Sequence, residues 1–289
     1  MRDGNGEVRG QVGAGPALLI AWEGRSAEEW AARLPAETVE FHRTVSSTND
    51  RASVLVGQGR RMPAVVVADR QSAGRGRRGR GWVSDSPLGL WFTVAWEVGE
   101  GVVGGLPLRV GLGVAGGVES VVPGLRVEVK WPNDLLVGGR KLGGILCERC
   151  GGHVLAGVGL NLNQEPADFP AALADTATSV RLAAGQGVPR ARVLAAVLDA
   201  LTAIGLRPQP EIPACELAEL EARSPLAGRG LRIDGIVRHS SGRPRAVEGL
   251  PVTAGPVLAD GSLEVRNDAG TRLRFIAGTI RRQGGNSGS

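Results

Sequence analysis

The sequence contains little cysteine, little lysine and no long hydrophobic run. Three cysteines in 289 residues do not make a disulfide framework. No stretch reaches the roughly 18 uncharged apolar residues that a membrane span needs. The apolar run at 16–22 is too short for a signal-peptide core followed by a cleavage site. These absences argue against a disulfide-rich secreted domain or a membrane protein, and they predict a cytoplasmic protein with no membrane partner.

Lysine is scarce although the chain is basic. Of the 34 basic residues only two are lysine, Lys130 and Lys141, and both fall in one short stretch. A coding bias toward arginine explains the scarcity but not the shared location. The net charge of +5 and the pI near 10.0 are compatible with nucleic acid, a phosphorylated ligand or an acidic partner, and prove none of them.

Length and patterning predict two ordered units. With 42% hydrophobic residues, the chain is neither a coiled coil, nor collagen-like, nor wholly disordered, and its length suits about two domains. We predict an N-terminal extension over 1–38, partly disordered, and a main domain of the α+β class, built on one sheet, over 39–224. A small domain of short strands should occupy 225–282, followed by a tail at 283–289.

Apolar runs and helix signals predict the individual elements of the main domain. Short apolar runs predict strands at 64–68, 90–96, 126–131, 142–148 and 153–160. Periodic segments predict helices at 48–56, 106–121, 190–204 and 213–222. A capping box from Ser26 to Glu29 should open a further short helix. Ser47 is the expected N-cap of the helix at 48–56, and Gly205 the expected end of the helix at 190–204.

A loop rich in arginine and glycine follows the first of these strands. The segment 74–82, called the Arg-Gly loop below, holds four Gly and four Arg and ends at Trp82. Glycine lets backbone N–H groups approach an anion, and arginine offers a planar fork to phosphate or carboxylate oxygens. The segment matches neither a P-loop nor a Rossmann fingerprint. A solvated basic loop or an RNA-binding tract would share this composition.

The two lysines flank a second motif, Lys-Trp-Pro-Asn-Asp at 130–134. Proline makes a rigid turn that presents Asn133 and Asp134 near a strand end. Lysine is a compact point charge that can place one donor at a reacting centre. Two glycines, Gly143 and Gly144, follow Lys141 in a predicted strand, which indicates close approach of a ligand or another backbone. Chance placement, or an exposed strand charge at Lys130, remains the alternative.

The remaining candidates are a helix start and scattered metal-ligand types. The segment 46–49 is an ordinary helix start, whose free N–H groups could also meet a polar ligand. Strand alternation would put Cys147 and Cys150 on opposite faces, and no second Cys pair completes a zinc site. The three histidines form no ligand spacing, and no Gly-x-Ser-x-Gly motif supports a hydrolase. The sequence therefore gives no metal ligands.

Taken in order, five segments closely resemble the biotin protein ligase family: 46–49, the Arg-Gly loop, 130–134, 141–146 and 157–161. The similarity runs over roughly 40–222, and the C-terminal β-domain also resembles that of the family. The resemblance implies a class II synthetase-like domain, a mixed sheet flanked by helices, with a C-terminal SH3-like β-barrel. It implies a ligase that activates biotin with Mg-ATP as biotinyl-5′-AMP. The biotinyl group then passes to a lysine of a biotin carboxyl carrier protein of acetyl-CoA or a related carboxylase.

Carried onto matching positions, the resemblance implies three overlapping groups of site residues. The catalytic group is Lys141, Arg75, Arg77 and Asp134. The biotin-binding group is Ser47, Thr48, Asn49, Gln71, Gly74, Arg75, Gly76, Arg77, Lys141 and Gly143. The nucleotide-binding group is Arg77, Arg78, Arg80, Trp82, Lys130, Asn133 and Asn161.

Three further expectations concern partners and alternatives. Only about 38 residues precede the first motif, which leaves little room for a winged helix-turn-helix, so we expect no DNA partner. A monomer and a homodimer both fit the sequence. A lipoate ligase or octanoyltransferase is the alternative enzyme, and an Arg-rich nucleic-acid binder is the distant one. The segment 237–248, with three arginines, has the composition of an enlarged hairpin loop of unassigned role.

Overall fold

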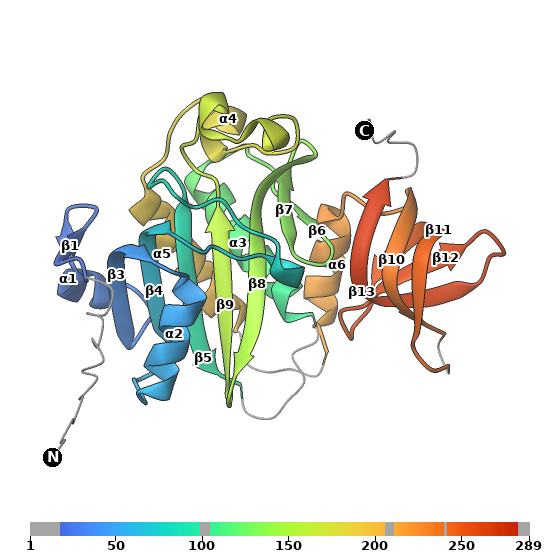
Figure 1. The fold of residues 1–289 in the computed structure, drawn as a ribbon, viewed down its shortest axis with the longest axis horizontal. Coiled ribbons are helices and arrows are strands. Elements are labelled where there is room, and N and C mark those ends of the chain that lie inside the picture. The colour runs from blue at the N-terminus through green and yellow to red at the C-terminus, as the bar shows by residue number, and fades with distance from the viewer. Residues whose placement is uncertain (1–17, 99–104, 206–210, 240–241, 283–289) are drawn as a thin grey trace, which may run out of the picture.

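The computed structural model describes residues 18–98, 105–205, 211–239 and 242–282, and its largest element is a seven-stranded sheet (Figure 1). The strand order is β3-β4-β5-β9-β8-β7-β6. In that order the strands span Thr38–Val45, Ala64–Gln71, Leu90–Glu97, His153–Leu160, Arg140–Cys150, Asp134–Val137 and Glu128–Lys130. β3 and β4 run parallel, and each other neighbouring pair is antiparallel. The sheet is therefore mixed.

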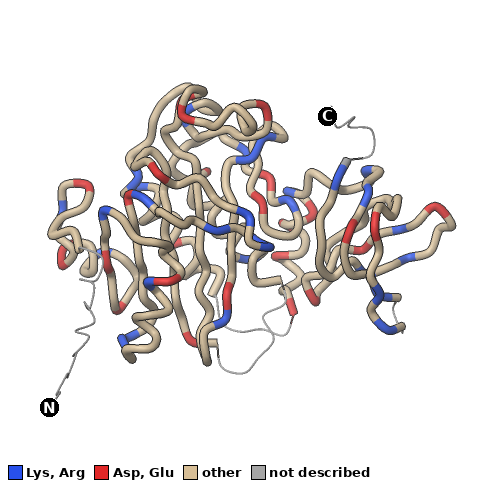
Figure 2. Tube along the Cα trace, in the orientation of Figure 1, with Lys and Arg blue, Asp and Glu red and all other residues tan. Residues whose placement is uncertain are grey.

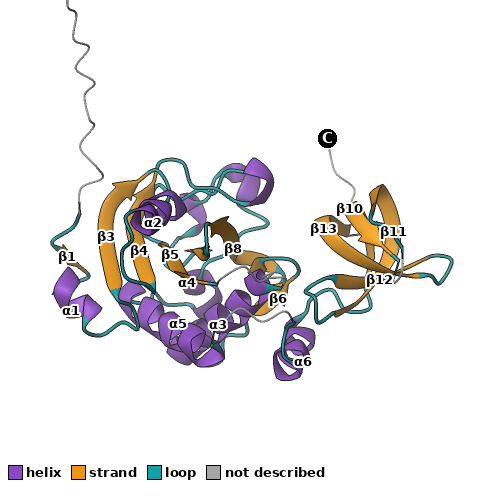
Figure 3. Ribbon diagram, turned by 90° about the horizontal axis from the view of Figure 1, so that it is seen from below, coloured by secondary structure: helices purple, strands orange, loops and turns teal. Residues whose placement is uncertain are grey.

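Helices cover both faces of this sheet (Figure 3). α2 (Thr48–Gly57) packs on one face in a small apolar cluster with β4, β5 and β9. α3 (Leu106–Val121) and α5 (Arg190–Ile204) pack on the other face within the large core. A Cβ added to Gly117 of α3 would lie 2.5 Å from the Val197 Cα atom. Glycine in α3 thus lets the two helices approach closely, at a cost in helix propensity.

Shorter elements complete the main part of the chain. α1 (Ala27–Ala31) and the hairpin of β1 (Ala21–Trp22) and β2 (Arg25–Ser26) lie beside β3 (Figure 1). α4 (Val180–Ala184) follows β9 after two 3₁₀ turns, and α6 (Ala214–Arg223) packs against β6. None of the helices that the structure describes is long and apolar enough to cross a membrane.

The C-terminal strands form a closed antiparallel barrel at the β6 side of the sheet (Figure 1). Its strands are β10 (Gly230–Arg238), β11 (Arg245–Val257), β12 (Leu263–Asn267) and β13 (Arg272–Arg282). Trp131, 3% exposed, joins the two parts. Its indole donates a hydrogen bond to the Gly261 carbonyl at 2.9 Å, and its ring centroid lies 4.9 Å from that of Phe275. The barrel is therefore packed onto the strand end that carries the Lys-Trp-Pro-Asn-Asp motif.

Most of the predicted elements and the fold class are confirmed. The helices at 106–121 and 190–204 have the predicted bounds, as does the strand at 153–160. The capping box at Ser26 is present, and Gly205 ends α5 in the left-handed region. Ser47 is the N-cap of α2 by position, but its side chain makes no capping bond.

Several elements differ from the prediction. β3, β7, α4 and the β1–β2 hairpin were not predicted, and the strand expected at 126–131 is only Glu128–Lys130. The loop expected at 237–248 is shorter, because Val237 pairs with Arg245 across β10 and β11. The predicted disorder near the N-terminus and in the tail lies outside the described residues, and the division into domains stays a prediction.

Candidate active site

One cavity of about 450 Å³ collects most of the predicted site residues, a size usual for small-molecule sites. It lies between the N-terminus of α2, the Arg-Gly loop, strands β8 and β9, and β13 of the barrel. The predicted residues that line it are Ser47, Thr48, Asn49, Gln71, Arg75, Gly76, Arg77, Arg80, Trp82, Lys130, Asn133, Asp134, Lys141 and Asn161. The structure thus brings together the five segments that carry the resemblance.

Three predicted residues do not line the cavity. A Cβ on Gly74 would collide with the Ser84 hydroxyl and the Trp82 carbonyl, so Gly74 permits a close turn. A Cβ on Gly143 would lie 2.7 Å from the Gly159 carbonyl, and its neighbour Gly144 is the one that lines the cavity. Arg78 points to the barrel, where it donates to the Thr279 hydroxyl at 2.9 Å.

Short-range bonds shape the Arg-Gly loop. The Trp82 N–H donates to the Gly74 carbonyl at 2.9 Å, and the Gly76 N–H donates to the Arg80 carbonyl at 2.7 Å. Between them, Arg78 adopts φ 59°, in the region that favours glycine. In Figure 2 the basic residues of this loop cross in front of the sheet. The loop folds as a tight turn with Arg77 and Arg80 lining the cavity.

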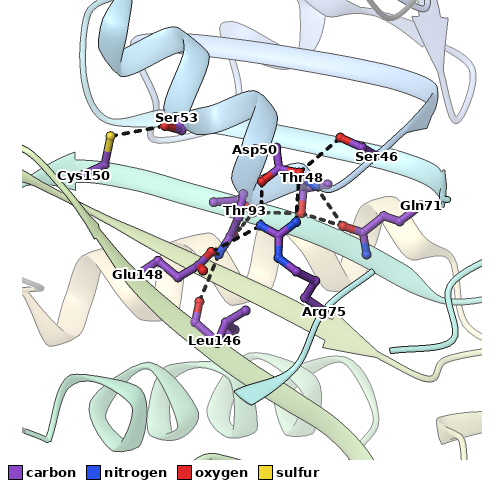
Figure 4. Close-up of polar contacts among 11 residues, drawn as sticks. Ser46, Thr48, Asp50, Ser53, Gln71, Arg75, Thr93, Leu146, Glu148 and Cys150 are labelled. Atoms are coloured by element: carbon purple, nitrogen blue, oxygen red, sulfur yellow. Dashed lines mark hydrogen bonds and ion pairs between the residues drawn. The ribbon is translucent and has the colours of Figure 1, made fainter. Parts of the chain in front are cut away.

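An ion pair fixes the base of the loop to α2 (Figure 4). Arg75 donates from its two terminal nitrogens to the two oxygens of Asp50, at 2.5 and 2.9 Å. The hydrogen bond from Arg75 lowers the pKa of Asp50, and the bond to Asp50 raises the pKa of Arg75. Glu148 approaches the same guanidinium at 3.8 Å. Arg75 is therefore held between two carboxylates.

The cationic end of the cavity is built around Asp134. The Lys141 ammonium donates to Asp134 at 2.6 Å, and the Lys130 ammonium lies 3.9 Å from the other oxygen. Burial lowers the pKa of the Arg77 guanidinium, neighbouring arginines add to that effect, and Asp134 opposes it. Arg77 lies within 3.5 Å of the Asn133 side-chain oxygen. A compact group of cations therefore faces the cavity, with one carboxylate holding it in place.

Trp82 lies on a floor of glycine. A Cβ on Gly159 would lie 2.5 Å from the Trp82 Nε1 atom, and one on Gly144 would lie 3.5 Å from its ring. The Lys141 ammonium is 5.4 Å from the ring centroid. The indole N–H is buried and finds no hydrogen-bond partner among the described residues. The ring is thus both packed on β8 and β9 and part of the cavity lining.

At the other end, polar side chains form a buried network. The Thr48 N–H donates to the Gln71 side-chain oxygen at 2.8 Å, and the Asn49 amide donates to Glu148 at 2.6 Å. Thr93, 0% exposed on β5, lies within hydrogen-bond distance of both Thr48 and Asn49. Thr93 and Glu148 were not predicted. The one sequence feature that pointed to this network was the Thr93 hydroxyl inside the apolar run of β5.

A second unpredicted group covers the cavity near Asn161. The Asn161 amide donates to the Thr178 carbonyl at 3.0 Å. Phe169 and Leu173, from the two 3₁₀ turns after β9, line the cavity beside the buried Gln164. The Gln164 side-chain oxygen has no partner among the described residues. The Asn-Leu-Asn-Gln run after β9 is the sequence feature that could have indicated it.

The weaker candidates do not form a site. Cys147 and Cys150 belong to different apolar clusters on the two faces of the sheet, as strand alternation predicts. Burial raises the pKa of the Cys147 thiol to about 12. Within the described part of the chain, no group of three or more His, Cys, Asp or Glu side chains is arranged to hold a metal ion.

Comparisons with known proteins agree with the motifs. Residues 41–165 match the Biotin/lipoate A/B protein ligase family. The bifunctional ligase/repressor BirA of Bacillus subtilis is 37% identical over 165 residues, which cover 55% of this chain and 50% of that protein. The biotin–[acetyl-CoA-carboxylase] ligase of Mycobacterium tuberculosis is 42% identical over 107 residues, covering 35% and 40%. The chain spans about half the length, or less, of these curated relatives.

A solved structure extends the likeness to the whole fold. The biotin protein ligase of Aquifex aeolicus, in complex with biotin and ATP, superposes with a TM-score of 0.68 at 23% identity. The match covers 86% of this chain and 100% of that one, so it includes the barrel as well as the sheet. Residues 41–165 are therefore similar to the biotin/lipoate A/B protein ligase family, and the resemblance to biotin protein ligases is confirmed over that part of the chain.

Proposed function

We propose that the protein is an ATP-dependent ligase that activates biotin as biotinyl-5′-AMP and transfers it to a lysine of a biotin carboxyl carrier protein. One observation carries this proposal: the polar pocket around Thr48 and the cation group around Lys141 belong to a single cavity. A carboxylic acid with a polar head can lie in one end while a nucleotide phosphate meets its carboxylate at the other.

In the first step, a carboxylate oxygen of biotin attacks the α-phosphorus of ATP. The new C–O–P bond forms as the bond to pyrophosphate breaks. Two anions must meet, and negative charge spreads over the phosphoryl oxygens in the transition state. Lys141 and Arg77 are fixed cations that stabilise this charge. Asp134, bonded to Lys141 at 2.6 Å, positions the ammonium and does not take part in the bond changes.

The nucleotide would occupy the end of the cavity lined by Trp82, Asn133 and Asn161. Trp82 offers an aromatic face for a purine ring. Mg²⁺ would arrive bound to the ATP phosphates, since this ion is commonly held by substrate phosphates rather than by an all-protein cage. Gly74, Arg78 and Gly143 would shape and anchor the site from outside the cavity lining.

In the second step, the neutral amine of the acceptor lysine attacks the carbonyl carbon of the mixed anhydride. An amide forms, the bond to AMP breaks, and the amine loses its proton. The Arg-Gly loop would keep water from the anhydride before the acceptor arrives, because hydrolysis competes with transfer. The acceptor belongs to acetyl-CoA carboxylase or a related carboxylase in this proposal, and the ligase acts as a monomer or a homodimer.

The direct experiment measures exchange of labelled pyrophosphate into ATP. Exchange should depend on biotin and Mg²⁺, and AMP should appear in proportion to biotin added to an acceptor domain. Lipoate or octanoate in place of biotin should support little exchange. Exchange with lipoate but not with biotin would replace the proposal by lipoate ligation, and no exchange with any of the acids would reject adenylation.

A further inference from the structure

A chain of hydrogen bonds runs from the partly exposed Glu148 on β8, through buried side chains, to Thr48 at the start of α2 (Figure 4). The Asn49 side-chain nitrogen lies 2.6 Å from a Glu148 oxygen. The Asn49 side-chain oxygen lies 2.6 Å from the Thr93 hydroxyl, which in turn lies 2.8 Å from the Thr48 hydroxyl. Thr48, Asn49 and Thr93 are each at most 4% exposed. Water therefore contributes little to their hydrogen bonding.

The chemistry of the groups fixes the direction of each bond. A carboxylate only accepts, so the Asn49 amide must turn its NH₂ group toward Glu148 and its carbonyl toward Thr93. A carbonyl also only accepts, so the single hydroxyl proton of Thr93 goes to Asn49. The 2.8 Å contact between the two hydroxyls then requires Thr48 to be the donor. Among the described residues, the other acceptor within reach of that proton is the Gln71 side-chain oxygen, at 3.2 Å.

The Thr48 hydroxyl is thereby left with lone pairs but no proton for a ligand. Both acceptors of its proton, on Thr93 and Gln71, belong to the protein. Thr48 itself lines the cavity. Gly157 leaves room for this arrangement, because a Cβ there would collide with the Asn49 side-chain oxygen. A ligand group that meets Thr48 must therefore bring an N–H or O–H donor.

We propose that Glu148 and Thr93 are positioning residues that orient the Thr48 hydroxyl as a hydrogen-bond acceptor, so that the cavity selects a ligand N–H at this point. This rests on the proposed function, under which the N–H belongs to the cyclic urea of biotin. Neither residue lines the cavity. Thr93 acts through Asn49 and Thr48, whereas Glu148 acts through Asn49 and also lies 3.8 Å from Arg75, so Thr93→Val is the cleaner of the two variants. A ring oxygen in place of the N–H would face the Thr48 lone pairs without a proton between them.

The test is calorimetric titration of the full chain with biotin and with its two cyclic carbamate analogues. Each analogue replaces one urea N–H by oxygen. The wild type should bind biotin at least about tenfold more tightly than one of them. Thr93→Val leaves only the Gln71 oxygen, at 3.2 Å, to hold the Thr48 proton, and Glu148→Gln no longer fixes which way the Asn49 amide faces, so in both variants the proton is held less firmly. Biotin affinity should then fall about tenfold, and the preference for biotin over that carbamate should shrink toward one.

Two further variants separate positioning from general damage. Thr93→Ser keeps the hydroxyl and should restore both the affinity and the preference. Ser53→Ala changes α2 at a residue bonded to Cys150, outside this network, and should behave as the wild type. Thermal unfolding checks that each variant is folded. If Thr93→Val does not fold, the single variants Glu148→Gln and Thr93→Ser still test the inference.

The outcomes distinguish the inference from the function on which it rests. Equal loss of affinity for biotin and the carbamates, with the preference unchanged, would overturn the positioning role while leaving biotin binding in place. Equal binding of biotin and both carbamates by the wild type would also overturn it. A wild type that binds no biotin would remove the proposed function, and the inference with it.

Discussion

The ammonium of Lys141 is the charge around which the candidate site is arranged. It lies 2.6 Å from Asp134 and 5.4 Å from the centroid of Trp82, so a strand, a turn and the Arg-Gly loop meet there. Arginine cannot reproduce this, because its charge is spread over a larger planar fork. The choice of lysine in an arginine-rich chain is thus explained by geometry.

Lys141→Arg should reduce biotin-dependent pyrophosphate exchange by about a hundredfold or more, the usual effect of losing one electrostatic contact to a transition state. Thermal unfolding should stay close to that of the wild type, since the side chain is partly exposed. Arg61→Lys, at an exposed ion pair remote from the cavity lining, is the control. A turnover rate near that of the wild type would remove Lys141 from the chemistry.

Glu40 gives the protein a pH-dependent stability term. Burial by itself raises the pKa of this carboxyl. Hydrogen bonds from Arg51 and His42 outweigh burial and bring the pKa down to about 2. The folded-state pKa of Glu40 lies below the ordinary 4.5. The stabilisation that ionised Glu40 gives the folded state is therefore complete above pH 4.5 and is lost as the pH falls toward 2. Arg51 lies on α2, so this pair also anchors the helix that carries Thr48.

Glu40→Gln should therefore lower the free energy of unfolding by about 3 kcal/mol at pH 6, and by less at pH 3. Urea unfolding at the two pH values measures both differences. Glu37→Gln, at an exposed pair with Arg61, should cost less than about 1 kcal/mol. A cost of Glu40→Gln that is the same at both pH values would contradict the linkage.

At this scale the sequence predicts the residues of strong motifs and misses their supports. The residues at 47–49, Lys141 and Asn161 stand in recognisable runs, and they line one cavity. Neither the apolar residues around Thr93 nor the mixed residues around Glu148 form a recognisable motif. Both side chains contact Asn49 because the folded sheet brings their strands beside α2. Contacts between residues so far apart in the chain have no local signature.

At the scale of elements, the β8–β9 hairpin provides a glycine floor for Trp82. A Cβ at Gly159 would occupy the place of the indole nitrogen. Gly159→Ala should therefore displace the ring and raise the KM for ATP about tenfold, with a smaller change for biotin. Gly152→Ala, in the turn of the same hairpin where nothing lies within 4 Å, is the matched control. Equal KM values for ATP in both variants would separate Trp82 from the nucleotide.

The Arg-Gly loop should respond to ligand. A few backbone bonds within the loop and side-chain bonds of Arg75, Arg77 and Arg78 anchor it. Four of its residues are glycine, which is entropically costly to order. Amide hydrogen exchange over 74–81 should slow when biotin or its adenylate binds. Equal exchange rates with and without ligand would show that closure of this loop plays no part.

Helices and strands differ in how far the sequence reveals them. α3 and α5 have long apolar periodicity and were predicted to the residue. β3 was missed because it holds no apolar run: the buried Glu40 and His42, which pair with each other inside the protein, stand between its apolar residues. β7 was missed because it is four residues long and follows directly on the Lys-Trp-Pro-Asn-Asp turn.

At the scale of the whole molecule, the barrel contributes to the cavity. Gly278, Thr279 and Ile280 of β13 line it, and Arg78 bonds to Thr279 from the loop side. The bond from Trp131 to Gly261 holds the barrel against the sheet. Hydrophobic patterning along the chain could not predict this, because the contact depends on how the barrel packs against the sheet.

Trp131→Phe should lower the free energy of unfolding by about 1 kcal/mol, because the partly buried Gly261 carbonyl loses its donor. The KM for ATP should rise as the barrel loosens. Trp96→Phe is the matched control, since the Trp96 N–H is buried without a partner among the described residues. The account of the interface fails if Trp96→Phe costs as much stability as Trp131→Phe and neither changes the KM.

The central claim is that this cavity joins biotin to AMP. The most direct measurement mixes the protein in molar excess with labelled biotin and Mg-ATP, without acceptor, and separates the products after quenching. We predict one equivalent of biotinyl-5′-AMP in the wild type and a much slower appearance in Lys141→Arg. If the wild type forms no biotinyl-5′-AMP and leaves biotin and ATP unchanged, the claim is contradicted.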